Sequence, residues 1–501
     1  MKLHPLSIPY RILQAGSGLI ALVFFAAFSI GQVAGGFQVP LLVALLVLGI
    51  LGTTAWQIAY YRRFEYELTP DTFDIRSGVI SRRNREIPLR RIQNVDITRN
   101  VFQRVLGVAE LRIETAGGSE SEARLRYVGY DEAKRLQNTL RRRSDEQGAG
   151  EIDAEDARDS LVEPRPAEEL LYAISPTDLV VLAIASFDLR VASFLFVLLS
   201  VAAPSVIFDL VVGLPINPLI VVAFALVFVV VASAVVSGAS AVFNTYGFRL
   251  TRQRDELRYE RGLFQRFDGS IPLDKVQTLV LQENVLKRLF GFASLTVETA
   301  GYAPGQGSVN SASAVPIADR EQTISIARAI EPFEAEISFE RPARRARIRY
   351  TIRYVLVVLV LTAIAFGIVS YFEFAFAWYA LLAGLVLAPL AAHLKWTNRG
   401  YYVDEEYLIT RDGFWNRKTH VVPYYRVQTV IESQTILQRR WRIGTVLIDT
   451  AGASGIVGGS PRAFDLDEGD ATRLRDLVAA QLQDALVRHA DRTGRERSFL
   501  T

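Results

Sequence analysis

A stretch of 31 residues occurs three times in this chain, and this repetition constrains the fold more than any other feature. The copies lie at 87–117, 271–301 and 422–452 and align without a gap. Residues recur at fixed spacing in and just before them: Gly78, Gly262 and Gly413; Pro88, Pro272 and Pro423; Gln93, Gln277 and Gln428; Thr115, Thr299 and Thr450. Repeats have to be recognised before any local assignment, because missing them misreads the whole fold. The chain therefore carries one module three times.

The composition is that of a membrane protein. Half of the 501 residues are hydrophobic, and the mean hydropathy of +0.20 is high for a soluble chain of this size. A pair of apolar runs precedes each module, and each run is long enough for a helix across a hydrocarbon core of about 30 Å. We therefore predict six transmembrane helices, at 12–34, 37–59, 191–212, 217–243, 352–371 and 375–394.

The distribution of basic residues predicts the topology. Arg and Lys flank the outer ends of every predicted helical hairpin, whereas the three hairpin loops contain neither. Cytoplasmic loops are enriched in Arg and Lys. We therefore expect a multi-pass protein of the cell membrane whose N-terminus, C-terminus and three modules all face the cytoplasm. The flanking residues are Arg11, Arg62, Arg63, Arg249, Arg252, Arg353, Lys395 and Arg399.

Each module has the pattern of short strands joined by turns. Each aligned Gly is predicted to take a positive φ in a hairpin turn, and each aligned Pro to begin or edge a strand. The aligned Gln either satisfies a backbone group inside the barrel or points into a shared groove. Residues 100–107 are typical of a helical turn ended by Gly107. In the third copy Arg442 replaces this glycine, and we expect the turn to end two residues later, at Gly444.

Helices and linkers complete the organisation. A closing helix is expected from Asp131 in the first module, and the closing helix of the third module, at about 469–492, is the longest. Asp188 and Arg190 would be costly within a span, so the helix before 191 is expected to lie on the membrane surface. The charged segment 144–168 is predicted to be a flexible linker. The predicted parts are hairpin 1 at 1–61, module 1 at 62–143, linker 144–174, hairpin 2 with its surface helix at 175–245, module 2 at 246–334, a basic segment at 335–351, hairpin 3 at 352–396, module 3 at 397–492 and a tail at 493–501.

A pair of spans followed by this module, given three times, resembles the bacterial pleckstrin-homology-like (PH-like) family, which is also described as a membrane-flanked domain family. The resemblance rests on the Gly, Ile-Pro and Arg-Ile-Gln pattern of the first copy, on its two counterparts, and on the Thr-Ala-Gly that ends each copy. It implies a strongly bent barrel of roughly seven strands capped by one helix, although a fold alone does not fix a function. The expected architecture is six transmembrane helices and three PH-like β-barrel domains, each with a C-terminal helix.

Two basic columns recur in the three copies. We predict that they contact anionic lipid headgroups below each hairpin, where one basic residue contributes about 1 kcal/mol. Solubility, or a salt bridge within the same module, is the structural alternative. A further basic group directly precedes the fifth predicted span and either fixes the topology or binds acidic lipid. The candidates are Arg91, Lys275 and Arg426; Arg104, Arg288 and Arg439; and Arg344, Arg345 and Arg347.

The sequence offers little support for catalysis. There are no cysteines, which excludes disulfides, thiolate metal sites and a cysteine nucleophile. The four histidines are scattered and lack metal-ligand spacing. No phosphate-binding loop, GxSxG elbow or HExxH motif occurs. We expect no catalytic residues, no metal, no cofactor and no nucleic-acid partner.

The pattern as a whole favours a non-catalytic scaffold. In this interpretation three PH-like modules are held at the inner leaflet, where they bind a partner protein, anionic lipid or one another. Two alternatives stay open: an accessory subunit of a membrane export or stress-defence system, and a membrane enzyme with its site between module and bilayer. Co-purifying transport subunits would favour the first alternative, and lipid turnover by the purified chain would favour the second.

Overall fold

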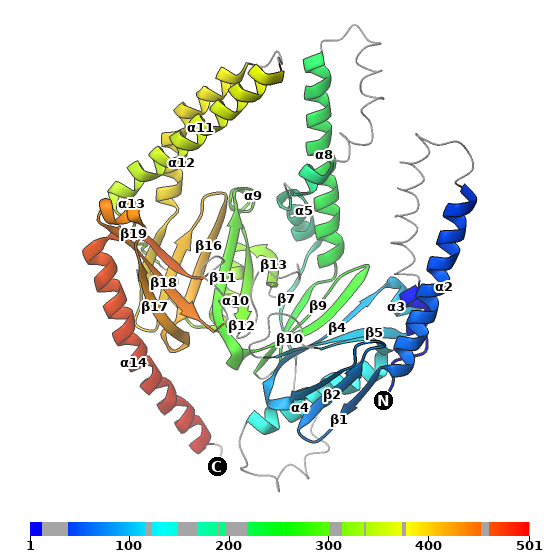
Figure 1. The fold of residues 1–501 in the computed structure, drawn as a ribbon. Helices are drawn as coiled ribbons and strands as arrows, with labels where there is room; N and C mark the ends of the chain where they lie inside the picture. The colour runs from blue at the N-terminus through cyan, green and yellow to red at the C-terminus, as the bar shows by residue number, and fades with distance from the viewer. Residues whose placement is uncertain are drawn as a thin grey trace. The chain divides into compact units, whose positions relative to one another are not determined.

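The structure is a computed structural model in which the chain divides into two compact units. Unit 1 comprises Met1–Leu170 and Tyr246–Ile271, and unit 2 comprises Leu171–Thr245 and Pro272–Thr501. The second repeat is thus divided between the units. The residues described are 1–12, 39–115, 123–148, 168–188, 190–195, 218–253, 255–299, 313–334, 337–372, 377–451 and 460–499 (Figure 1).

Every repeat has the same order of elements: three strands, a 3-10 turn after the aligned proline, a long strand, a five-residue helix, two strands and a closing helix. Repeat 1 has β1 (Glu65–Leu68), β2 (Thr72–Ser77), β3 (Arg83–Pro88), η2 (Leu89–Arg91), β4 (Ile92–Asn100), α3 (Val101–Val105), β5 (Val108–Thr115), β6 (Ala123–Gly129) and α4 (Tyr130–Gly148). Repeat 2 has β8 (Arg249–Gln253), β9 (Glu256–Arg261), β10 (Gln265–Pro272), η4 (Leu273–Lys275), β11 (Val276–Asn284), α9 (Val285–Leu289), β12 (Phe292–Thr299), β13 (Ser313–Asp319) and α10 (Arg320–Ile330). Repeat 3 has β14 (Gly400–Val403), β15 (Tyr407–Asp412), β16 (Asn416–Pro423), η6 (Tyr424–Arg426), β17 (Val427–Ser433), α13 (Ile436–Arg440), β18 (Ile443–Thr450), β19 (Arg462–Asp467) and α14 (Glu468–Phe499).

The turn between the second and third strands of each repeat requires the aligned glycine. Gly78, Gly262 and Gly413 have φ values of 110°, 102° and 97°, a region that residues with a Cβ rarely adopt. A Cβ at Gly78 would lie 1.9 Å from the carbonyl oxygen of Ser81. The predicted hairpin turn is confirmed, and the aligned proline ends the third strand in each repeat.

The short helix after the long strand begins and ends where its sequence predicts. The Asn100 side chain accepts a hydrogen bond from the Gln103 backbone N–H, and the Gln103 side chain accepts one from the Asn100 backbone N–H. Gly107 follows α3 with a φ of 66°. In repeat 3, α13 ends at the aligned position, Arg440, and the predicted two-residue extension is wrong. Arg442 itself adopts the left-handed conformation that the glycine has elsewhere, with a φ of 51°.

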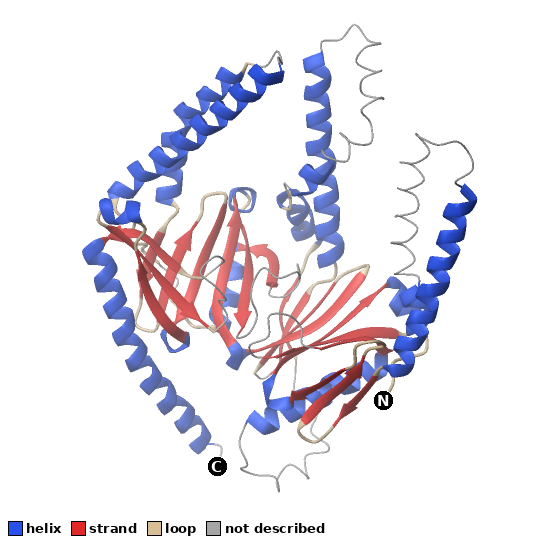
Figure 2. Ribbon diagram, in the orientation of Figure 1, coloured by secondary structure: helices blue, strands red, loops and turns tan. Residues whose placement is uncertain are grey.

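Successive repeats share sheets. In unit 1 the strand order β6-β5-β4-β10-β9-β8 adds the first half of repeat 2 to the second half of repeat 1, with Gln265 opposite Asn100. In unit 2 the six-stranded sheet β13-β12-β11-β16-β15-β14 joins repeats 2 and 3 in the same way, with Asn416 opposite Asn284. Figure 2 shows these strands in red. The first half of repeat 1 and the second half of repeat 3 form separate three-stranded sheets, β1-β2-β3 in unit 1 and β17-β18-β19 in unit 2.

This sharing differs from the self-contained barrel expected for each module. A repeat contributes two halves of three strands each, and a neighbouring repeat supplies the next strand of the sheet. Strands pair through backbone N–H and C=O groups, which every residue except proline carries. An edge strand can therefore pair with the next repeat as readily as with its own.

The closing helix covers the sheet and fills the core. In α4, Ala133, Leu136 and Leu140 are buried at a spacing of three and four residues, the period of one helix face. They pack against buried strand residues such as Leu111 and Ile113. The α14 helix does the same in repeat 3 and, as predicted, is the longest, with 32 residues against 19 in α4 and 11 in α10.

Three helices of the described residues are long and apolar enough to cross a membrane. They are Phe224–Thr245 within α8 (Pro218–Thr245), Arg344–Tyr371 within α11 (Arg344–Phe372), and Trp378–Thr397, which comprises η5 (Trp378–Ala383) and α12 (Gly384–Thr397). They coincide with the fourth, fifth and sixth predicted spans, and α11 packs against α12 (Figure 1).

The prediction of six spans is supported for these three only. The second predicted span falls on α2 (Val39–Arg63), which is not among them, and the predictions at 12–34 and 191–212 lie largely outside the described residues. At the place of the predicted surface helix lies α5 (Pro176–Ala185), an apolar helix of ten residues, too short to cross a core of about 30 Å. At the two ends of the segment predicted as a linker, α4 extends to Gly148 and β7 covers Glu169–Ala173; residues 149–167 lie outside the described residues.

Candidate functional site

A buried carboxylate lies where the third hairpin meets its domain. Asp465 on β19 is 1% exposed and has a φ of 54°. Arg349 and Tyr350 reach it from α11, Arg399 reaches it from just after α12, and Gln438 reaches it from α13. One side chain therefore binds the domain to both helices of the hairpin.

The carboxylate is saturated with hydrogen-bond donors. Gln438 Nε2 donates to Oδ1 of Asp465 at 2.7 Å, and Arg399 Nη1 donates to Oδ2 at 3.4 Å. The same Arg399 donates to the Tyr350 hydroxyl at 2.7 Å and to Asp412 at 2.6 Å. A buried charge is tolerated when it is paired and hydrogen-bonded in this way.

Electrostatics keep this network charged at neutral pH. Burial alone would raise the pKa of Asp465, but the hydrogen bond from Tyr350 and the charge of Arg349 outweigh it and hold the pKa below its ordinary value. Burial alone would lower the pKa of Arg399, but Tyr350 and Asp412 raise it above the ordinary value. A carboxylate that stays ionised and has no free lone pair suits anchoring rather than proton transfer.

The other two repeats attach their hairpins differently at the same position. Two residues before the end of the last strand, repeat 1 has Tyr127 and repeat 2 has Ile317. The Tyr127 ring meets Tyr10 edge to face, with ring centres 4.8 Å apart. The carbonyl of Ile317 accepts a hydrogen bond from Tyr172, which leads into α5. Only repeat 3 uses a charge here.

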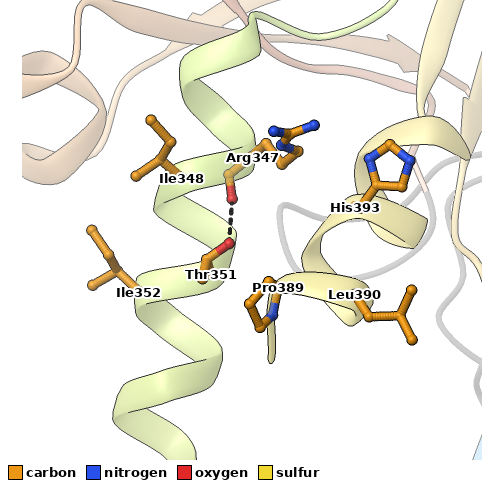
Figure 3. A pocket seen from close by; sticks show the side chains of 7 residues that line it. All are labelled: Arg347, Ile348, Thr351, Ile352, Pro389, Leu390 and His393. Atoms are coloured by element: carbon orange, nitrogen blue, oxygen red, sulfur yellow. Dashed lines mark hydrogen bonds between the residues drawn. The ribbon is translucent and has the colours of Figure 1, made fainter. Parts of the chain in front are cut away.

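An open groove lies between α11 and α12, close to the buried network (Figure 3). Its volume is about 570 Å³. Figure 3 shows Arg347 and His393 toward one end of the groove and Ile352 and Leu390 toward the other. Thr351 Oγ1 is occupied, because it donates to the Arg347 carbonyl at 3.0 Å. The groove thus combines a cationic end with apolar walls. Its lining residues are Arg347, Ile348, Thr351, Ile352, Pro389, Leu390 and His393.

The basic group before α11 divides between two tasks. Arg345 pairs with Asp467 on β19 and so belongs to the attachment of the domain. Arg347 lines the groove. Arg344 is exposed at the first turn of α11. The three predicted residues therefore do not form a single site.

Two members of one basic column bind the neighbouring repeat. Arg104 Nη2 donates to the Leu263 carbonyl at 2.7 Å, and Arg288 Nη2 donates to the Phe414 carbonyl at 2.5 Å. Leu263 and Phe414 are aligned residues, each directly after a turn glycine. Arg288 also donates to Asn398, at the end of α12, at 3.0 Å. The third member, Arg439, is exposed. These contacts are neither headgroup contacts nor salt bridges within a module.

The other basic column lies at the end of the 3-10 turns. Arg426 donates to the Asp274 carbonyl of the preceding repeat, and its guanidinium lies 4.7 Å from the centre of the Tyr425 ring. Arg91 is exposed and Lys275 is half-buried. Of the aligned glutamines, Gln277 is buried and makes a long hydrogen bond of 3.4 Å to the Lys275 carbonyl.

Sequence reasoning missed Asp465. The available signal was an acidic residue at an aligned strand position where the other copies have Tyr127 and Ile317. Its partners lie 27 to 116 residues away in the chain, so no local motif contains them. Within the ranges that the structure describes, no group of three or more His, Cys, Asp or Glu residues could hold a metal ion.

Comparison with known proteins agrees with the repeat. A family model described as the bacterial PH domain matches residues 20–144, 186–333 and 347–482. The chain is also similar to UPF0699 transmembrane protein YdbT of Bacillus subtilis (strain 168), with 25% identity over 462 residues, which are 89% of this chain and 91% of the relative. No solved structure matches. Each matched segment contains one hairpin region and the module that follows it.

Proposed function

Because this chain belongs to the bacterial PH domain family and carries that domain three times, we propose that it is a non-catalytic membrane scaffold. It holds three cytoplasmic domains against the inner leaflet, where they bind anionic lipid headgroups, a partner protein, or both. The matched family is not a known family of enzymes. The observation that carries the proposal is the buried Asp465 network, since a domain bound to both helices of its hairpin is held at the end of the spans.

The groove beside this network is suited to an anionic lipid. Arg347 supplies a positive charge at one end, and Ile352 and Leu390 supply apolar walls toward the centre of the hairpin. A headgroup phosphate beside the guanidinium and an acyl chain along the isoleucine and leucine would match this polarity. His393 adds a ring nitrogen that can donate a hydrogen bond to the same phosphate.

Lipid competition tests the headgroup contact. A fluorescent phosphatidylglycerol analogue is bound to the purified full-length chain in detergent, and its affinity is compared between variants. Arg347→Gln removes a contribution of about 1 kcal/mol, so we expect affinity to fall about fivefold. Arg344→Gln is the matched control, because it removes the same charge from the exposed first turn of α11 without lining the groove. Equal loss in both variants, or equal binding of a phosphatidylcholine analogue, would contradict the proposal.

The proposed topology can be read with single cysteines, because the chain has none of its own. Cysteines at the exposed positions Gln483 in α14 and Arg83 in β3 are expected to react with a membrane-impermeant maleimide only after cell lysis. A cysteine at Tyr379, at the far end of the third hairpin, is expected to react in intact cells. Labelling of Gln483→Cys in intact cells would place the domains outside and overturn the proposal.

A further inference from the structure

The joint between successive repeats is built twice in the same way. In unit 1, β10 pairs antiparallel with β4, and Phe267 lies opposite Thr98. In unit 2, β16 pairs antiparallel with β11, and Lys418 lies opposite Gln282. These two pairs occupy aligned positions of the repeat, so the register is identical. The joint is therefore a property of the repeat and not of one pair of strands.

An arginine from the short helix closes each joint. Arg104 of α3 and Arg288 of α9 donate to the carbonyls of Leu263 and Phe414, which directly follow the turn glycine of the next repeat. A guanidinium that donates to a backbone carbonyl forms a charge-assisted hydrogen bond and recognises no particular side chain. Any copy of the turn can thus receive the arginine of any short helix.

The first and the last repeat each have one strand edge of the kind that forms these joints. β3 is the outer strand of β1-β2-β3 and β17 is the outer strand of β17-β18-β19, and among the described residues neither has a second neighbouring strand. For Arg439, the third arginine of the column, the described part of the chain provides no acceptor for the exposed guanidinium. Exposed strand edges of this kind are templates for pairing with another chain.

Exposed apolar side chains lie beside these two edges. Leu437 of α13 is 64% exposed, against 36% for Leu286 and 63% for Phe102, its aligned residues in the formed joints. Ile80 of the β2–β3 turn is 85% exposed, against 53% for Phe264 and 77% for Trp415. The apolar surface that pairing would cover here is therefore small, and the inference depends on the two strand edges and the arginine.

From these observations we infer that β17 of one copy of this chain pairs antiparallel with β3 of a second copy. Extending the register of the two internal joints places Ser433 opposite Arg83. The Arg439 guanidinium then donates to the Val79 carbonyl, the residue that follows Gly78. That carbonyl has capacity for it, because its present bond to Arg63 is long, at 3.4 Å, and a carbonyl oxygen has two lone pairs.

The charges of the two edges are compatible with this register. β3 reads RNREIP and carries two arginines and one glutamate, whereas β17 reads VQTVIES and carries one glutamate and no basic residue. Like charges directly opposite each other are unfavourable, and here Glu432 lies opposite Asn84 while Arg85 lies opposite Ile431. Two β17 edges or two β3 edges would lack the arginine-to-turn contact. The contact is therefore between unlike ends of two copies, which produces a closed ring or an open chain of copies in the membrane.

Disulfide trapping tests the pairing. Because the chain has no native cysteine, only the introduced cysteines can form a disulfide. Two full-length copies with different affinity tags are co-expressed, one with Ser433→Cys and the other with Arg83→Cys. Opposite residues of antiparallel strands have Cα atoms about 4.5–5.5 Å apart, within the range that a disulfide spans. We expect a cross-linked dimer carrying both tags after mild oxidation of the membranes. Adding Arg439→Ala to the Ser433→Cys copy is expected to lower the yield several-fold.

Two controls fix the interpretation. Asn84→Cys in place of Arg83→Cys moves the thiol to the opposite face of β3, so the dimer yield is expected to fall at least about tenfold. Gln282→Cys with Lys418→Cys in one chain places the same pair in the internal joint of unit 2, and it is expected to cross-link within the chain. If this internal pair forms while the Ser433 and Arg83 pair does not, the inference is wrong. It is also wrong if both cysteines in one chain link only within that chain.

Discussion

Repeats 1 and 3 hold their helices with opposite chemistry at the same strand position. In repeat 1 the buried Tyr127 contacts Tyr10 edge to face, and the neighbouring Arg11 lies over the Tyr60 ring of α2, 4.6 Å from its centre. In repeat 3 that position is Asp465, and every donor around it carries a charge or a strong dipole. An aromatic contact tolerates small displacements, whereas a buried ion pair depends on every partner being in place.

The difference shows that the repeat determines where the last strand meets the helices, whereas the side chain at that position varies between copies. The aligned backbone brings the last strand beside the helices in both repeats, and the side chain placed there decides how firmly they are joined. Repeat 3 also has Arg345 paired with Asp467 and Trp396 Nε1 donating to the Pro342 carbonyl at 3.0 Å. The third hairpin and its domain are thus expected to move as one body.

Neutralising the buried carboxylate should have the largest effect. Asp465→Asn leaves the buried Arg399 and the half-buried Arg349 without their shared counter-charge, which costs about 3–5 kcal/mol. Tyr127→Phe in repeat 1 removes only a hydroxyl, and we expect a cost of about 1 kcal/mol. Hydrogen exchange of the full-length chain measures both, as the free energy of local opening of β19 and of β6.

A surface carboxylate two residues away is the matched control. The Asp467 side chain is 46% exposed and pairs with Arg345, so Asp467→Asn is expected to change the opening of β19 by about 0–1 kcal/mol. If Asp465→Asn costs no more than this control, the buried network does not anchor the hairpin. Repeats 1 and 3 would then differ in the residues that contact the helices, but not in how strongly those contacts stabilise the structure.

pH should separate the two repeats next. The lowered pKa of Asp465 means that its contribution is complete above the unfolded pKa of about 3.9 and is lost as pH falls through the folded value. Burial raises the pKa of Tyr127, so its contribution is complete below about 10 and is lost as pH rises through the folded value. Repeat 3 is therefore expected to loosen in acid, where the Tyr127 contact of repeat 1 is unaffected. In alkali both repeats are expected to loosen, because burial also raises the pKa of Tyr424 in the core of repeat 3.

The fluorescence of single-tryptophan variants measures these pH-dependent changes in the full-length chain. A variant that keeps only Trp396 follows repeat 3, and one that keeps only Trp56 in α2 follows repeat 1. We expect a fluorescence transition below pH 4 for the first and above pH 10 for the second. Asp465→Asn should abolish the acid transition at Trp396, and an unchanged transition would assign it to other groups.

Much of the fold can be predicted from the sequence, because each position of the repeat occurs three times and the copies can be compared. The turn at Gly78 and its counterparts, the short helix capped by Asn100 and the long closing helix all depend on local conformational preferences. Local preferences are visible in a sequence. The positions of the three spans found in the described residues follow from apolar length in the same way.

The shared sheets and the site could not be predicted in this way. β4 and β10 join through backbone groups, which have no side-chain signature, and the partners of Asp465 are brought together only by the tertiary fold. The basic column shows the consequence. The recurrence of Arg104 and Arg288 predicts a shared role, but it does not reveal that each donates to a backbone carbonyl of the next repeat. The recurrence of a residue shows that a contact is repeated, and the structure is needed to show what it contacts.

The smallest expected effect concerns the residue after the short helix, where the repeats again differ. Gly107 has a φ of 66° and Arg442 has a φ of 51°, so repeat 3 accepts a left-handed residue that carries a side chain. Nothing lies within 4 Å of a Cβ built at Gly107, so Gly107→Ala adds backbone strain alone and should cost about 1 kcal/mol. Arg442→Gly relieves that strain but gains freedom in the unfolded chain, for a net stabilisation of about 0.5 kcal/mol. Hydrogen exchange of α3 and α13 measures both changes, and a loss of stability in Arg442→Gly would mean that the Arg442 side chain makes a contact that repeat 1 lacks.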